Sequence, residues 1–206
     1  LDFGIYLLLV AMLACNGGDK NANLTINIKN NKAKQAVYVD LLELDGEPVA
    51  LDTASVAVGA SKLTMKAGTV NSSIICRVRF EQSPAFILLV PDQSNLELDL
   101  DFDNAQSYTI NSPGSNSFKN VVTSFNEMIA GLDSIKLKID AKGESMDSSR
   151  VVLENQFRAK IELAGNYLLA YADTTQTPAI ALYAVGMTQS IVSPDRLLIA
   201  MERISK

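Results

Sequence analysis

The period of the hydrophobic pattern changes near residue 112, and this change constrains the fold more than any other feature of the chain. From Leu24 to about Ile110, apolar residues alternate with polar ones, which is the period of half-buried β-strands. After "NSPGSNS" (111–117), apolar residues recur every three or four positions, as on one face of an α-helix. Strands followed by helices predict an α+β protein whose two kinds of element form separate layers.

The first part of the pattern predicts seven or eight short strands separated by turn residues. The strand-like runs are "LTINIK" (24–29), "AVYVDLLEL" (36–44), "TASVAV" (53–58), "KLTMKA" (62–67), "IICRVRF" (74–80), "AFILLV" (85–90), "NLELDLDF" (95–102) and "SYTI" (107–110). Residues 24–112 are therefore expected to form an antiparallel β-sandwich or a partly open barrel. "AFILLV" is apolar throughout and is predicted to be a central strand covered on both faces.

Residues 113–206 are predicted to form a mostly helical segment. One apolar stripe consists of Phe118, Val121, Phe125, Met128, Leu132 and Ile135, and a second of Leu153, Phe157, Ile161, Leu168 and Tyr171. Gly143 is expected to separate these two helices. Thr177-Pro178 and Ser193-Pro194 each place a capping residue before a proline, which predicts two shorter helices. The pattern leaves open whether the helices pack on the sheet or form a separate bundle.

The amino-terminal stretch "LLLVAMLACNGGDK" is typical of an export signal. The apolar run from Gly4 to Ala14 is shorter than the roughly 20 residues that a transmembrane helix needs. Met12-Leu13-Ala14-Cys15 resembles the lipobox of bacterial lipoproteins, in which the cysteine is acylated after cleavage. We therefore predict a signal peptide at 1–14, lipidation at Cys15 and a flexible tether at 15–23. The alternatives are an ordinary cleaved signal or a buried amphiphilic start, in either of which Cys15 is incidental.

Composition excludes several kinds of chemistry. The chain has no histidine, so Ser-His-Asp and Cys-His catalysis and histidine-ligated zinc sites are excluded. A net charge of −5 argues against binding to nucleic acid. We expect no catalytic residue, no metal ligand and no cofactor in the chain.

Cys76 is the second cysteine and a poor candidate for thiol chemistry. In "SIICRVRF" it shares one strand face with Ile74, Val78 and Phe80, whereas Arg77 and Arg79 lie on the other face. A thiol on an apolar face is most simply a small buried hydrophobe. The sequence also contains no C-x-x-C motif for disulfide exchange.

The segment "NLELDLDFDN" places four carboxylates, Glu97, Asp99, Asp101 and Asp103, on one strand face. Their spacing resembles the start of an EF-hand loop, but Asn104 and Ile110 stand where that loop needs Gly and Glu. The favoured interpretation is a solvated, charged face that resists edge pairing. A glycosidase-like carboxylate pair at Asp99 and Asp101 is the alternative.

Two other patterns have structural interpretations. The segment "SPGSNS" precedes a helix, and we expect it to cap that helix, through Ser115 or Ser117, rather than to bind phosphate. The aromatic residues Tyr167, Tyr171 and Tyr183 lie at helical spacing and are expected in a core or an interface.

The order of these features is similar to that of a known family. The lipobox is followed by "LTINIKN", by "AVYVDLLELDGEPVALDTASVAVGASKLTM" and by "NSPGSNSFKNVVTSF". Together, over Leu24 to Ile204, they resemble the amino-terminal domain of envelope thioredoxin-like lipoproteins of the AhpC/TSA, thiol-disulfide interchange type. That domain has no assigned function of its own. In the family a thioredoxin fold bearing W-C-x-x-C follows, and Lys206 lies about where it begins.

The resemblance and the lipobox together predict a non-catalytic accessory module held at the cell envelope by lipid on Cys15. It would face the periplasm or the cell surface, and its parent protein would be a thiol-disulfide oxidoreductase, of which this chain is a copy truncated before the redox domain or a variant without it. The expected partners are the membrane, a carboxy-terminal thioredoxin-like domain or redox partner, and a second copy in a homodimer. A stand-alone lipoprotein that holds a ligand between sheet and helices is the alternative.

Overall fold

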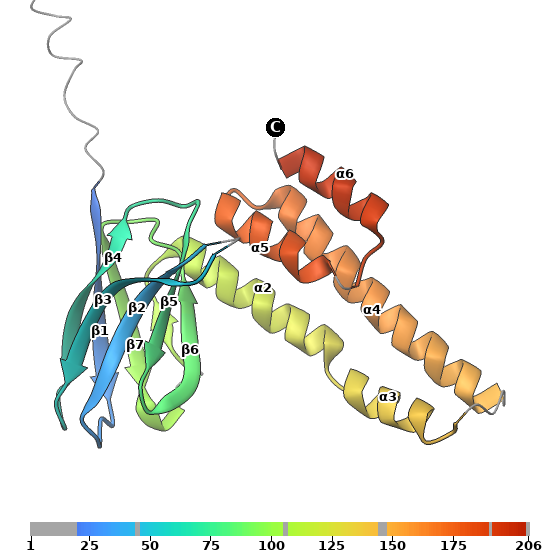
Figure 1. Cartoon of the computed structure of the whole chain (residues 1–206), viewed down its shortest axis with the longest axis horizontal. Coiled ribbons are helices and arrows are strands. Elements are labelled where there is room, and N and C mark those ends of the chain that lie inside the picture. The colour runs from blue at the N-terminus through green and yellow to red at the C-terminus, as the bar shows by residue number, and fades with distance from the viewer. Residues whose placement is uncertain (1–19, 44–45, 105–106, 144–147, 190, 205–206) are drawn as a thin grey trace, which may run out of the picture.

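The protein is a β-sandwich from one end of which a group of helices extends (Figure 1). The computed structural model describes residues 20–206 apart from 44–45, 105–106, 144–147, 190 and 205–206. The strands are β1 (Asn21–Lys29), β2 (Gln35–Leu42), β3 (Val49–Val56), β4 (Lys62–Thr69), β5 (Ile75–Phe80), β6 (Ser83–Leu89), β7 (Asn95–Asp101) and β8 (Thr109–Ile110). The helices are η1 (Phe102–Asn104), α2 (Pro113–Ile129), α3 (Leu132–Asp140), α4 (Ser148–Thr174), α5 (Pro178–Thr188) and α6 (Pro194–Ile204). The predicted α+β class is confirmed, in its sandwich form.

Each sheet of the sandwich has four strands among the described residues. The first sheet has the order β4-β1-β7-β8 and the second the order β3-β2-β5-β6. Neighbouring strands are antiparallel except β1 and β7, which run parallel with Asn27 opposite Asp99. The prediction of an antiparallel sandwich is therefore correct for every pair but this one.

The core of the sandwich follows from the alternating pattern. The residues that point inward from the strands are almost fully buried: Leu24, Ile26, Val37, Val39, Met65, Cys76, Val78, Leu96, Leu98 and Leu100 are each at most 2% exposed. At one end of this core the rings of Phe80 and Phe102 meet edge to face, with centroids 5.2 Å apart.

The prediction that "AFILLV" forms a central strand is wrong. Residues 85–89 belong to β6, which is the outermost strand of the second sheet, and Val90 follows that strand. Ile87 and Leu89 point into the sandwich, whereas Phe86 on the opposite face is 55% exposed. The run is apolar on both faces because helices cover the outer face farther along the strand, at Leu88 and Val90.

The first apolar stripe of the helical segment is divided between two helices. Gly131 has a φ of 82° and separates α2 from α3, so the expected single helix through Ile135 is interrupted there. A left-handed backbone at this position favours glycine, because a Cβ would be strained. The two shorter helices predicted after Thr177 and Ser193 are confirmed as α5 and α6.

The helices pack on the sandwich, which answers a question that the sequence left open. Ile75 on β5 and Val90, which follows β6, are buried together with residues of α2, α4 and α5, among them Phe118, Leu168 and Ile180. The backbone N–H of Ala179 also donates to the carbonyl of Ser72. Helix α2 leads away from the sandwich, and α4 returns alongside α2 and α3 (Figure 1).

Candidate functional site

Three of the four predicted carboxylates, Glu97, Asp99 and Asp101, lie on β7, on the outer face of the first sheet. The strand ends at Asp101, so Asp103 belongs to η1 and its predicted place on the strand face is wrong. Glu97 and Asp99 are exposed on β7, while Leu96, Leu98 and Leu100 are buried, as the alternation predicts. Asp99 accepts hydrogen bonds from Asn27 Nδ2 at 2.7 Å and from Thr109 Oγ1 at 3.2 Å. The short strand β8 pairs with β7 at Leu98 and Asp99, so β7 is not an edge strand there. For that part of the row the interpretation that the carboxylates resist edge pairing is wrong.

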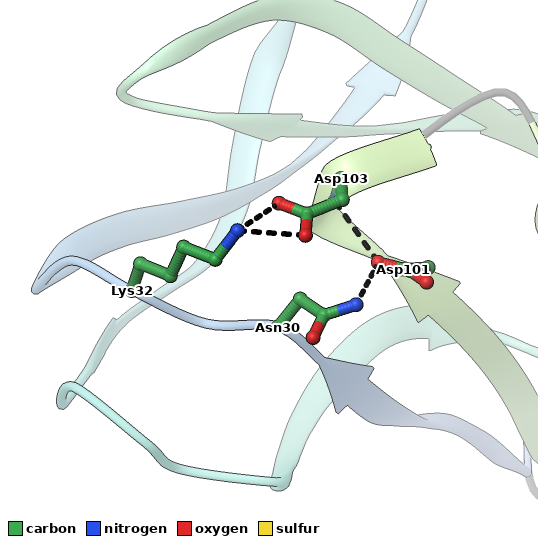
Figure 2. A network of polar contacts seen from close by, with 4 residues as sticks. All are labelled: Asn30, Lys32, Asp101 and Asp103. Carbon is green, nitrogen blue, oxygen red and sulfur yellow. Dashed lines mark hydrogen bonds and ion pairs between the residues drawn. The ribbon is translucent and has the colours of Figure 1, made fainter.

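Asp101 and Asp103, at the end of the row, belong to a local polar network (Figure 2). Asn30 Nδ2 donates to Asp101 Oδ1 at 2.8 Å, and the backbone N–H of Asp103 donates to the same oxygen at 2.9 Å. Lys32 Nζ lies 2.7 Å from both carboxylate oxygens of Asp103. The hydrogen bond from Asn30, and then that from Asp103, hold the pKa of Asp101 below its usual range.

This network joins the ends of β1 and β7. Asn30 has a φ of 58°, a conformation that asparagine tolerates better than most residues, and this turns its amide toward Asp101. Among the described residues, no group of three or more His, Cys, Asp or Glu side chains lies close enough together to hold a metal ion. The carboxylates of Asp99, Asp101 and Asp103 thus each accept from an amide, hydroxyl or ammonium group.

Cys76 lies in the core of the sandwich, as its strand face predicts. Its side chain is fully buried, and Sγ donates to the carbonyl of Ala67 at 3.6 Å. Burial raises the pKa of the thiol to about 12. Since the thiolate is the reactive form, the folded protein keeps this sulfur both inaccessible and protonated.

The start of α2 is a buried polar junction, but its capping residue is not one of those expected. Ser112 is the cap: its Oγ accepts from the N–H of Ser115 at 2.9 Å. The hydroxyl of Ser115 lies inside the helix and accepts from the N–H of Val90 at 2.9 Å. Ser117 contributes its carbonyl, which accepts from Tyr171 Oη at 3.3 Å. The helix begins earlier than expected because Pro113 occupies its first turn.

The N–H groups at the start of α2 are occupied by the protein itself. Asp92 Oδ2 accepts from the N–H of Gly114 at 2.7 Å. A Cβ on Gly114 would lie 2.9 Å from that oxygen and 3.3 Å from the side chain of Val90. The glycine in "SPGSNS" therefore allows close packing of α2 against the sandwich, and the expectation of a structural role is supported.

The three helical tyrosines pack around the core that joins helices and sheet. The ring of Tyr183 meets Phe118 edge to face at 4.6 Å, and burial raises the pKa of Tyr183. Tyr167 and Tyr171 have ring centroids 6.3 Å apart and border the same cluster. All three are half-buried at the border of this cluster, in agreement with the predicted position in a core or an interface.

The outer face of the second sheet carries a charged cluster that the sequence analysis missed. The side chain of Asp40 is 3% exposed, and its Oδ2 accepts from Arg77 Nη2 at 2.8 Å, Arg77 Nε at 3.2 Å and Arg79 Nε at 2.8 Å. Burial acts to raise the pKa of Asp40, but the hydrogen bonds and charges of Arg79 and Arg77 outweigh it and hold the pKa below its usual range. The guanidinium of Arg79 also stacks over the ring of Tyr38, 3.9 Å from its centroid.

A signal for this cluster was present in the sequence. Arg77 and Arg79 alternate with core residues in "CRVRF", and Asp40 follows the strand-like "VYV". Nothing in the sequence indicates that β2 and β5 are neighbours, which is what brings Asp40 opposite Arg77.

Helix α6 exposes three large apolar side chains beside charged ones such as Asp195 and Glu202. Leu198, Ile199 and Met201 are each exposed by half or more, whereas Ala200 is buried and Leu197 packs toward the bundle. The opposite side is fixed to α4 by two polar contacts, Arg196 Nη2 to Asn166 Oδ1 at 2.5 Å and Arg203 Nη1 to Asp173 Oδ2 at 2.9 Å.

Cys15, the predicted lipidation site, lies outside the described residues. Within the described part of the chain, no helix combines the length and the apolar character needed to cross a bilayer. No protein-family model matches the chain, and no curated protein matches its sequence. The resemblance to thioredoxin-like lipoproteins therefore remains a prediction.

Proposed function

We propose that this chain is the non-catalytic accessory module of an envelope thiol-disulfide oxidoreductase-type lipoprotein, anchored to a membrane through Cys15. Its sandwich is the structural body, and its helices dock a thioredoxin-like partner domain. The signal-like residues 1–14 and Cys15 support the anchor, and the order of motifs from Leu24 to Ile204 supports the redox link.

The observation that carries the docking role is the outer surface of α6. Most of the exposed surface of a helix in a monomeric protein is polar, and contiguous exposed apolar side chains mark interaction sites. Leu198, Ile199 and Met201 are all exposed on an eleven-residue helix that already packs on the bundle through Leu197 and Ala200. The partner that the resemblance implies, a thioredoxin fold, would follow this helix in the chain.

The state of Cys76 supports a role without redox chemistry of its own. A working redox cysteine is exposed enough to react and has a low pKa, whereas this thiol is buried and its pKa is about 12. In the proposed arrangement the reactive thiols belong to the partner domain, and this chain only holds that domain in place.

The alternative function requires a ligand between sheet and helices. In the described residues that junction is occupied by side chains: Ile75, Val90 and Phe118 are each at most 8% exposed. No observation at the junction favours the alternative, so the accessory role is retained as the single proposal.

The test is to sequence the coding region past Lys206 and then to compare variants of the longer protein by limited proteolysis. A domain bearing W-C-x-x-C is expected there, and a stop codon at that position would remove the redox link. In the longer protein, Leu198→Glu should separate that domain from α6 and speed its release by limited proteolysis. Leu137→Glu on α3, which replaces a leucine at least as exposed, is the matched control. Equal proteolysis of the two variants would refute docking on α6.

A further inference from the structure

The outer face of the second sheet is divided into a covered part and an open part. Leu42, Ile75, Leu88 and Val90 lie under the helices. The open part contains Tyr38, Arg77, Arg79 and Phe86, which we call the arginine patch. These four side chains line one hollow of about 360 Å³, bordered also by Glu81, Ser83 and Ala85.

The arginines of the patch have unused hydrogen-bonding capacity. All three of their side-chain hydrogen bonds go to a single oxygen, Asp40 Oδ2. Arg79 donates only through Nε, so among the described residues its two terminal nitrogens have no protein partner. Since a guanidinium has five N–H donors in a fixed plane, Arg79 presents a ready-made fork to an incoming carboxylate.

The surroundings hold that fork in place. The ring of Tyr38 supports the guanidinium from below at 3.9 Å, and Asp40 fixes Nε, so little side-chain freedom is left to lose on binding. The side chain of Arg79 is nevertheless 42% exposed and reachable. Two arginines face one buried aspartate here, in a chain whose net charge is −5. Glu81 lies at the edge of the hollow, and its carboxylate accepts a hydrogen bond from the N–H of Ala36 at 2.9 Å.

The patch has the composition of a protein interface rather than of a small-molecule pocket. Arginine, tyrosine and phenylalanine are enriched where proteins bind one another. Phe86, 55% exposed, offers an apolar surface beside the charged one. Small ligands need a site that buries most of their surface, whereas an open hollow on a sheet face suits a chain segment lying across it.

We propose that the arginine patch is a binding site for an acidic protein segment. A carboxylate side chain of the segment pairs with the terminal nitrogens of Arg79, and a neighbouring apolar side chain packs on Phe86. The site lies on the sandwich, apart from α6, and does not depend on the docking role proposed above.

The test uses the purified full chain and the labelled peptide acetyl-Ser-Phe-Glu-Val-Ser-amide, followed by fluorescence anisotropy and by amide chemical shifts. The comparison peptide carries Gln in place of Glu. Saturable binding of the Glu peptide is expected, with shifts concentrated at Tyr38, Arg79 and Phe86. The Gln peptide should bind about tenfold more weakly, because it loses one charge-assisted pair.

Variants assign the effect to single side chains. Arg79→Gln should remove the preference for Glu over Gln, which a double-mutant cycle measures directly. Phe86→Ala should weaken both peptides alike; because the side chain is exposed, this variant is expected to stay folded. Arg158→Gln, which removes an exposed arginine on α4, is the matched control and should change nothing.

Three results would overturn the proposal: no saturable binding of either peptide to the folded chain, equal affinity for both peptides, or a Glu preference that survives Arg79→Gln.

Discussion

Replacing Asp40 by asparagine should destabilise the protein by about 2 kcal/mol. The substitution keeps the shape of the side chain but removes the charge that holds Arg77 and Arg79. Breaking a fully buried ion pair typically costs about 3–5 kcal/mol. Here only the carboxylate is buried: the side chains of Arg77 and Arg79 are 28% and 42% exposed, so both guanidiniums regain water and the loss is smaller.

The pH dependence of stability is a second test of the contact between Asp40 and the two arginines. Because the folded-state pKa of Asp40 is lower than that of the unfolded chain, its stabilisation is present above about pH 4. It is lost as the pH falls through the lower pKa of the folded state. Asp40→Asn should therefore have a flatter stability profile below pH 4 than the wild type.

Urea unfolding followed by circular dichroism, at neutral pH and at several pH values down to about 2, measures both effects. The control is Asp99→Asn, which removes an exposed carboxylate with two neutral donors and should stay within about 0.5 kcal/mol of the wild type. An Asp40→Asn loss no larger than that of the control would show that the arginines hold their positions without the buried charge.

The remaining predictions concern packing. Cys76 should not react with a thiol reagent in the folded protein, and stability should fall as the pH rises above about 9, because the unfolded thiol ionises there whereas the folded one keeps its proton until about 12. Cys76→Ala should reduce this loss of stability at alkaline pH. An unchanged dependence of stability on pH would contradict the assignment of the loss to the buried thiol. Gly114→Ala should destabilise by about 1–3 kcal/mol, since its Cβ would press on Asp92 and Val90. Gly186→Ala, on α5 with open space around it, should instead stabilise the protein by about 0.5–1 kcal/mol. Thermal or urea unfolding measures both variants, and a Gly114→Ala variant more stable than Gly186→Ala would refute the packing described.

The alternation of apolar and polar residues was enough to predict the strands and their buried faces. Leu96, Leu98, Leu100 and Cys76 are buried, because the apolar face of each strand in a two-sheet protein packs against the opposite sheet. The same rule misjudged "AFILLV", whose outer face at Leu88 is covered by helices from far along the chain. A local pattern indicates that a face is buried but not which element buries it.

The sequence pattern did not predict which distant strands pair with each other. The parallel pair of β1 and β7 and the contact of Asp40 with Arg77 and Arg79 depend on which strands become neighbours. No periodicity within a single strand carries that information. The sequence therefore places Arg77 and Arg79 on the strand face opposite Cys76 without indicating their partner.

Helix boundaries depended on single residues within a stripe that otherwise continues. Apolar positions run without interruption from Phe118 to Ile135, yet the left-handed backbone of Gly131 divides them. Ser112 rather than Ser115 or Ser117 caps α2, because Pro113 begins the helix and Ser115 is drawn into hydrogen bonds with Val90.

Mass spectrometry of the mature protein purified from the envelope fraction tests the central claim, that lipid on Cys15 holds this body at a membrane. The account predicts a polypeptide whose first residue is Cys15 and whose mass includes acyl chains, and a Cys15→Ser variant that is absent from the membrane pellet. An unmodified first residue, together with a variant that stays in the pellet, would contradict it.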